Sequence, residues 1–108
     1  GIEAAITLAD EYRKNNGLDI QLEIEARNLG EVDEILRVGL IDRIMLDNFS
    51  FEDLRKAVAK IPEGIENEAS GGITIGNVRE YAECGVDFIS IGALTHSVSS
   101  LDISLKAY

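Results

Sequence analysis

The chain has 108 residues, of which 45% are hydrophobic and 28% are charged, and this composition predicts a single globular domain with its own core. No apolar stretch approaches the ~20 residues of a membrane span. The formal net charge of −10 argues against nucleic acid as a partner, because phosphates would be repelled. The single cysteine, Cys84, excludes an internal disulfide and is typical of a reducing compartment. We therefore expect a cytoplasmic protein, or one of a plastid or other organelle if the source is eukaryotic.

The first third of the chain alternates between helical and extended patterns. Apolar residues at helical spacing predict a helix over residues 2–14, which Gly17 ends. Apolar residues alternating with polar ones predict a strand over residues 18–26. Asn28 then caps a second helix, which Gly39 ends.

The same alternation continues to the C-terminus. Ser50 caps a third helix that Pro62 ends, and a short apolar stripe predicts a fourth helix over residues 75–83. A last short helix is predicted over residues 101–106. Between these helices, the sequence predicts three further strands, over residues 43–48, 65–70 and 88–91.

This order of elements is one helix followed by four βα units, which predicts a parallel sheet with right-handed crossovers. In parallel α/β folds, functional residues follow the carboxyl ends of the strands. Those ends carry two carboxylates and then two glycine turns: Glu25, Asp47, Ser70-Gly71-Gly72 and Gly92-Ala93.

The turn at Gly71 and Gly72 has the features of a phosphate site. Glycines let backbone N–H groups approach an anion closely, a helix start follows at Thr74, and Ser70 adds a hydroxyl donor. Taken alone, the same turn also fits an ordinary strand-to-helix connection.

The order of the four strand ends favours a barrel. The (β/α)8 barrel has a recurrent phosphate site in the loops after its last two strands. We therefore predict that residues 1–108 form one partial domain, the C-terminal half of a TIM-like open α/β barrel with four strands and a leading helix. Glu25 and Asp47 would face a sugar or a divalent cation, because oxygen ligands suit Mg²⁺.

Five stretches together resemble one family, the carboxylating nicotinate-nucleotide pyrophosphorylases, also called quinolinate phosphoribosyltransferases. The resemblance covers nearly the whole chain. The stretches are EIE at 23–25, RIMLDNF at 43–49, EASGGIT at 68–74, SIGALTHS at 90–97 and LDISLK at 101–106.

The resemblance implies an enzyme of NAD biosynthesis that converts quinolinate and phosphoribosyl pyrophosphate into nicotinate mononucleotide, pyrophosphate and CO2, using Mg²⁺. It implies that Glu25 and Asp47 contact the ribose hydroxyls and Mg²⁺. It also implies a phosphate pocket made by Ser70, Gly71, Gly72, Gly92 and Ala93, an open barrel with an N-terminal domain, and at least a dimer.

The cationic half of such a site is not evident in these 108 residues. The family binds its anionic substrates with Arg and Lys from the N-terminal domain and early barrel strands, whereas here only Arg27 closely follows a strand end. We therefore expect the isolated polypeptide to be inactive. An autonomous half-barrel without activity and a phosphate-binding module without catalysis remain alternatives. Open strand edges and an exposed, apolar barrel interior predict a homo-oligomer.

Overall fold

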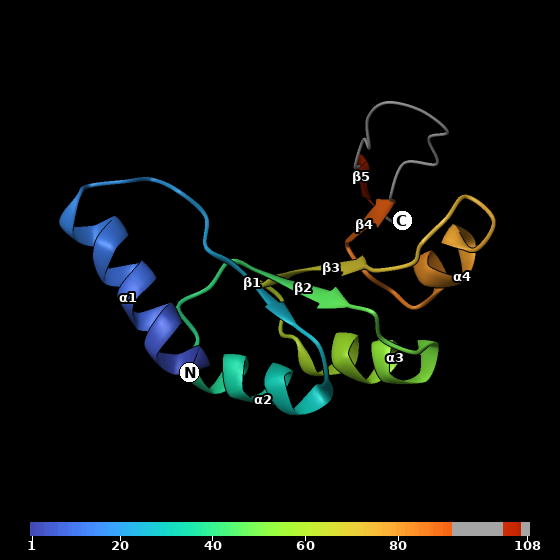
Figure 1. The fold of residues 1–108 in the computed structure, drawn as a ribbon, viewed down its shortest axis with the longest axis horizontal. Coiled ribbons are helices and arrows are strands. Elements are labelled where there is room, and N and C mark those ends of the chain that lie inside the picture. Colours follow the sequence, from blue (N-terminus) through green and yellow to red (C-terminus); the bar gives the residue numbers. More distant parts are fainter. Residues whose placement is uncertain (92–102, 107–108) are drawn as a thin grey trace.

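A computed structural model describes residues 1–91 and the backbone of residues 103–106 (Figure 1). The described elements alternate between helix and strand until the last one. They are α1 (Ile2–Asn15), β1 (Glu23–Ala26), α2 (Leu29–Val38), β2 (Arg43–Asp47), α3 (Phe51–Lys60), β3 (Glu66–Ser70), α4 (Val78–Glu83), β4 (Phe88–Ile91) and β5 (Ile103–Lys106).

The strands form one sheet in the order β1-β2-β3-β4-β5, and the first four run parallel as predicted. The expected last helix is wrong, because Ile103–Lys106 is a strand paired antiparallel with β4. The sequence of this segment, ISLK, alternates apolar and polar residues with the period of a strand. Pairing also satisfies the backbone groups on one side of β4, and a six-residue helix could not do so.

Two predicted boundaries are shifted. The first strand begins at Glu23 rather than at residue 18, because its neighbour β2 begins at Arg43, the register partner of Glu23. The fourth helix begins at Val78 rather than at residue 75, because the side chain of Asn77 bonds the preceding turn, its Oδ1 accepting from Thr74 N at 2.7 Å. Such local side-chain bonds compete with a helical backbone.

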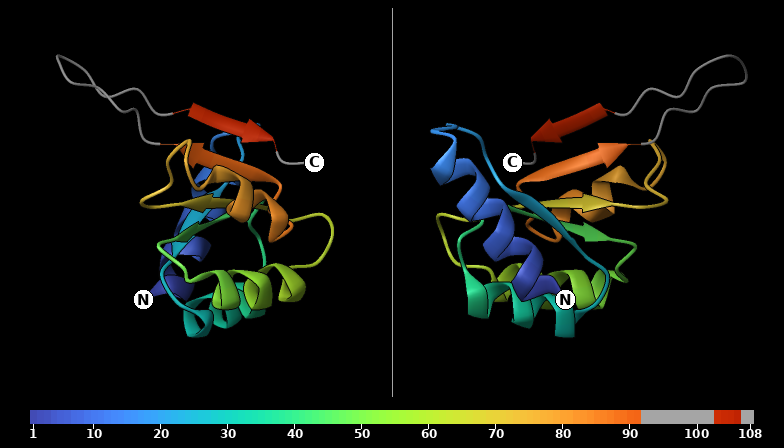
Figure 2. Two further views of the ribbon diagram at one scale, coloured as in Figure 1. Left: turned by 90° about the vertical axis from the view of Figure 1, so that its right-hand side faces the viewer. Right: turned by 60° about the vertical axis from the view of Figure 1, so that its left-hand side comes forward.

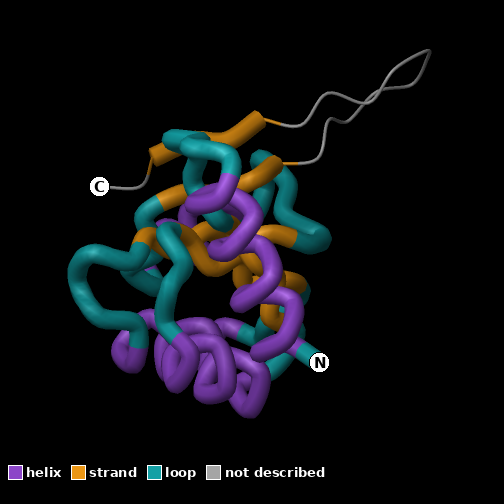
Figure 3. Tube along the Cα trace, turned by 90° about the vertical axis from the view of Figure 1, so that its left-hand side faces the viewer, coloured by secondary structure: helices purple, strands orange, loops and turns teal. Residues whose placement is uncertain are grey.

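Helices α2 and α3 start at the predicted caps and cover one face of the sheet (Figure 2). The side chains of Asn28 and Ser50 accept hydrogen bonds from Glu31 N at 2.8 Å and Asp53 N at 3.2 Å. α1 packs beside α2 at the β1 side of the sheet (Figure 3). The core between the helices and the sheet contains fully buried side chains, among them Val32, Ile35, Ile44, Leu46 and Leu54.

The opposite face of the sheet carries no helix in the described part of the chain (Figure 2). Because side chains alternate along a strand, every second residue points to this open face. On β1 to β4, Met45 and Phe88 are the apolar residues of this face, and the others are polar or charged: Glu23, Glu25, Arg43, Asp47, Glu66, Glu68, Ser70 and Ser90. The expectation of an apolar interior is therefore wrong for these four strands.

The described residues contain no helix that is both long and apolar enough to cross a bilayer. Apolar residues of the two central parallel strands and β4 are buried, among them Ile44, Leu46, Ile89 and Ile91. Ile24, on β1 at the sheet edge, is only half-buried and packs against the core.

Candidate functional site

The carboxyl ends of β2 and β3 are joined by hydrogen bonds. Asp47 and Ser70 are register partners, and Ser70 Oγ donates to Asp47 Oδ1 at 3.3 Å. One residue further on, Asn48 N donates to Ser70 O at 2.9 Å. The predicted carboxylate of β2 and the predicted phosphate turn of β3 therefore lie in one place.

Gly71 is required by this contact. Its φ is +91°, and a Cβ added there would lie 2.8 Å from Asn48 N and 2.9 Å from Asp47 Oδ1. Gly72 also has a positive φ, +66°, but a Cβ there would meet nothing within 4 Å. Gly71 thus allows the two strand ends to touch, and Gly72 leaves the turn open on its outer side.

A cavity of about 380 Å³ lies at this turn. Its wall comes from β2, β3, β4 and the loop after β3: Met45, Ser70, Gly71, Gly72, Ile73, Thr74 and Ser90. All three phosphate-site residues predicted on β3 and its turn line it. The other two, Gly92 and Ala93, fall outside the described residues.

The loop after the glycines differs from the sequence prediction. Thr74 N is already bonded to Asn77 Oδ1, and Asn77 Nδ2 donates to Gly72 O at 3.2 Å. Since α4 begins only at Val78, Gly71 and Gly72 belong to a loop stiffened by Asn77 and not to the start of a helix. Any anion held here would therefore depend on the loop's own donors.

Glu25 lies on the same open face as Asp47 but further from the strand ends. Its register partner is Met45, and its exposed carboxylate is 3.5 Å from Arg27 Nε. Within the described residues, no cluster of three or more His, Cys, Asp or Glu could hold a metal ion. Two carboxylates nevertheless suit Mg²⁺, which often takes its remaining ligands from waters and substrate phosphates.

A charged cluster on the open face was not predicted. Arg43 Nη1 lies 3.2 Å from Glu68 Oε1 and Arg43 Nη2 lies 3.2 Å from Glu66 Oε1. The guanidinium also stacks on Phe88, with 4.0 Å between Cζ and the ring centroid, and Ser90 Oγ donates to Glu68 Oε2. The sequence does show oppositely charged residues at alternate positions of β2 and β3. They predict this cluster only when the register between the two strands is known.

This cluster acts on its neighbour Glu23. Partial loss of hydration and the nearby Glu68 carboxylate raise the pKa of Glu23, while the charge of Arg43 lowers it. The open face is therefore a coupled electrostatic surface and not a set of separate solvated side chains.

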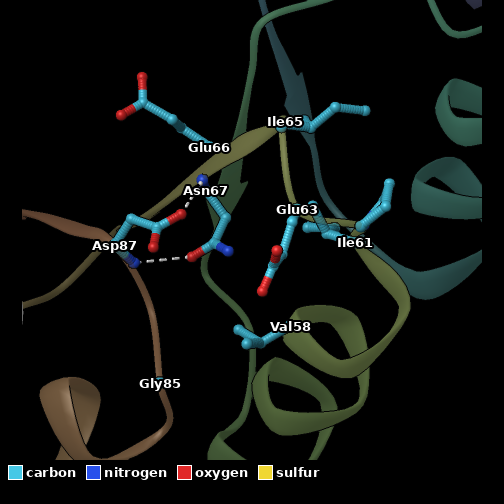
Figure 4. A pocket seen from close by; sticks show the side chains of 10 residues that line it. Val58, Ile61, Glu63, Ile65, Glu66, Asn67, Gly85 and Asp87 are labelled. Carbon is cyan, nitrogen blue, oxygen red and sulfur yellow. Dashed lines mark hydrogen bonds between the residues drawn. The ribbon is translucent and has the colours of Figure 1, made fainter.

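The opposite, N-terminal end of the strands contains a second cavity of about 390 Å³ (Figure 4). There Asn67 N donates to Asp87 Oδ2 at 3.0 Å and Asp87 N donates to Asn67 Oδ1 at 2.9 Å. These two reciprocal hydrogen bonds join β3 to the start of β4 and provide partners for the buried Asn67. It explains a polar residue on the helix-covered face, and it lies at the end of the sheet that parallel α/β folds use for stability.

Cys84 is buried, and its thiol contacts the carbonyl oxygen of Glu80 at 3.3 Å. Burial raises the pKa of the Cys84 thiol, so the reactive thiolate is disfavoured. This environment indicates a structural role for Cys84 and not a reactive one.

Four parallel strands connected by helices, with acidic residues and a glycine turn at the strand carboxyl ends, form part of an α/β barrel, a fold whose functional sites lie at those ends. The profile of the family described as "Quinolinate phosphoribosyl transferase, C-terminal domain" matches residues 1–106. The chain belongs to this family.

Individual relatives agree with this assignment. The chain is 42% identical to the chloroplastic nicotinate-nucleotide pyrophosphorylase [carboxylating] of Arabidopsis thaliana, matching 98% of this chain and 34% of that protein. It is 43% identical to a probable enzyme of the same name from Methanocaldococcus jannaschii, matching 97% of this chain and 38% of that protein.

A solved structure of nicotinate-nucleotide pyrophosphorylase from Francisella tularensis superposes with a TM-score of 0.78 at 32% identity, over 97% of this chain and 37% of that one. The chain thus spans about a third of the length of the relatives it matches.

Proposed function

We propose that this chain supplies the phosphoribosyl-binding end of a quinolinate phosphoribosyltransferase, which forms nicotinate mononucleotide, pyrophosphate and CO2 from quinolinate and phosphoribosyl pyrophosphate. Membership of the family and the names of the relatives support this reaction. We place the protein in the cytoplasm or in an organelle; plant relatives are named chloroplastic or mitochondrial. Following the family resemblance, we propose that it works as a homo-oligomer.

The contact between Asp47, Ser70 and Gly71 carries the proposal. This contact places a carboxylate beside a turn suited to phosphate. Phosphoribosyl pyrophosphate carries ribose hydroxyls, which a carboxylate can bind, close to a phosphate group, which the turn can bind. In this proposal, the Ser70 hydroxyl and the N–H groups of Gly71 and Gly72 hold the phosphate. Asp47 and Glu25 face the ribose hydroxyls, and Gly92 with Ala93 closes the pocket.

The acidic side chains suit the chemistry of the sugar. Cleavage of the bond between ribose C1 and pyrophosphate develops positive charge on the sugar, and carboxylates fixed nearby stabilise it. Glu25 and Asp47 are also the residues that would hold Mg²⁺. Bound Mg²⁺ would supply neutralisation of the leaving pyrophosphate.

Positive charge for the anionic substrates is scarce in this part of the molecule. Arg27 and Arg43 are the arginines at or beside the described strands, and each is paired with carboxylates. We therefore expect the 108-residue polypeptide alone to form no product. Phosphate binding without catalysis is the second candidate function, because the hydroxyl and N–H groups of the glycine turn could hold a phosphate without the cations that the full reaction needs.

The test combines turnover with binding. Formation of nicotinate mononucleotide is measured in a single turnover at high enzyme concentration, and inorganic phosphate is titrated while amide NMR shifts are followed. We expect no turnover and shifts centred on residues 70–72. Gly71→Val should abolish those shifts, because it fills the contact with Asn48 and strains the backbone.

Gly64→Val is the matched control, because Gly64 has a φ of +99° but open space around its Cβ position. It should share the backbone strain while keeping the phosphate response. Robust turnover would contradict the expected inactivity of the isolated chain. Phosphate shifts that spare residues 70–72 would contradict the site.

A further inference from the structure

Glu68 is a buried carboxylate close to the proposed phosphate cavity, and both of its oxygens are engaged. The side chain is 4% exposed; Oε1 lies 3.2 Å from Arg43 Nη1, and Oε2 accepts the hydrogen bond of Ser90 Oγ. Ser90 lines the cavity. Glu68 lies two residues before Ser70 on the same face of β3, so their Cα atoms are roughly 7 Å apart.

This position creates an electrostatic problem for an anion site. A negative charge at Glu68 lies within about one Debye length, ~8 Å at physiological salt, of a phosphate at Ser70. Burial weakens the screening further, so the repulsion must be offset by a nearby cation. Arg43 is placed to do this.

The guanidinium of Arg43 is held from several sides. Nη1 contacts Glu68, Nη2 contacts Glu66, and its plane covers the ring of Phe88. Its Nε is buried and has no hydrogen-bond partner among the described residues. A surface ion pair would not fix an arginine in this way, because it would leave the side chain hydrated and mobile.

We propose that Arg43 and Glu68 are positioning residues of the phosphate cavity. Glu68 fixes the Ser90 hydroxyl in the cavity wall, and Arg43 offsets the charge of Glu68 so that the cavity accepts an anion. The inference rests on the proposed phosphate site. It adds to that site a charge pair that contacts no ligand and controls affinity through its neighbours.

The alternative is an ion pair that contributes only to stability, and the two roles predict different phosphate affinities. If Arg43 offsets Glu68, removing the arginine alone leaves an uncompensated negative charge beside the anion. Removing both charges together restores the balance. A pair that acts only on stability would show no such reversal.

The experiment titrates the full 108-residue chain with inorganic phosphate at constant ionic strength, with chloride as the exchanged anion, and follows the amide shifts of residues 70–72. The variants are Arg43→Met, Glu68→Gln and the double variant. We expect Arg43→Met to weaken phosphate binding by about tenfold. Glu68→Gln should bind at least as tightly as the wild type, and the double variant should return to within about threefold of it.

Arg55→Met is the matched control. It changes the net charge by the same amount from an exposed position on α3 and should leave phosphate affinity unchanged. Unfolding in urea is measured for every variant to separate stability from affinity. If Arg43→Met fails to fold, Glu68→Gln alone decides the question, because the Gln side chain keeps an acceptor for the Ser90 hydroxyl. A loss of phosphate affinity in Glu68→Gln would then overturn the proposal.

The remaining outcomes are also decisive. Equal weakening by Arg43→Met and Arg55→Met, or a double variant no better than Arg43→Met, would overturn the positioning role alone. A wild-type chain with no phosphate response at residues 70–72 would overturn both the proposed site and this inference.

Discussion

The two faces of the sheet are built on opposite principles. On the helix-covered face, Ile44 and Leu46 of β2 are fully buried against α2 and α3. On the open face, Arg43 and Asp47, which flank these two residues, form an ion pair and a hydrogen bond with residues of β3. One residue step along β2 therefore separates apolar burial from polar pairing.

This difference bears on how copies of the chain associate. Apolar surface would drive association by burial, whereas the open face carries charged side chains that are largely paired within the chain. The sheet edges among the described strands are β1 and β5, because β5 pairs with β4. Oligomerisation stays a prediction, and edge pairing is now its main physical basis.

The largest expected effect on stability comes from substituting two neighbouring residues of β2 that point to opposite faces of the sheet. Ile44→Ala should lower the free energy of unfolding by about 2–5 kcal/mol, because it opens a cavity at a site with 0% exposure. Met45→Ala, one residue on and facing the open side, should cost clearly less. Urea unfolding of both variants measures the difference, and equal losses would mean that the open face is also closed by packing.

The second prediction concerns the point where the strand ends touch. Gly72→Ala should cost about 1–2 kcal/mol, because its positive φ strains any residue with a Cβ. Gly71→Ala should cost measurably more, since its Cβ would also collide with the backbone of Asn48. Thermal and urea unfolding of the pair checks this order. The reverse order would show that the contact between β2 and β3 is loose.

The smallest predicted effects are those of pH. On α1, the hydrogen bond from Lys14 lowers the pKa of Asp10, burial opposes the shift, and Arg13 adds to it. A lowered pKa stabilises the folded protein above the unfolded pKa of about 4, and this contribution disappears as pH falls through the folded value. Asp10→Asn should therefore destabilise the protein at pH 7, and the difference should shrink below about pH 4.

Glu23 on the open face should behave in the opposite way. Its raised pKa means that ionisation destabilises the folded state at pH values above that pKa. Glu23→Gln should therefore stabilise the protein slightly at pH 7, with no difference from the wild type below about pH 4. The free energy of unfolding across this pH range measures both variants. The same sign for both variants would contradict the opposite pKa shifts of Asp10 and Glu23.

The sequence by itself determined the local features of this protein. The caps at Asn28 and Ser50 and the positive φ at Gly71 could be predicted, because each depends on bonds or dihedrals within a few residues. The four parallel strands could also be predicted, because their apolar residues recur with a strand period and helices separate them.

Only the tertiary structure decided the pairings between distant residues. Arg43 and Glu68 are 25 positions apart, and nothing local in either strand indicates that their side chains meet. Likewise, residues 103–106 became a strand because β4 offered an edge, which overrode a weak helical pattern. Local preferences differ by a few tenths of a kcal/mol per residue, so pairing with a neighbouring strand or a buried charge outweighs them.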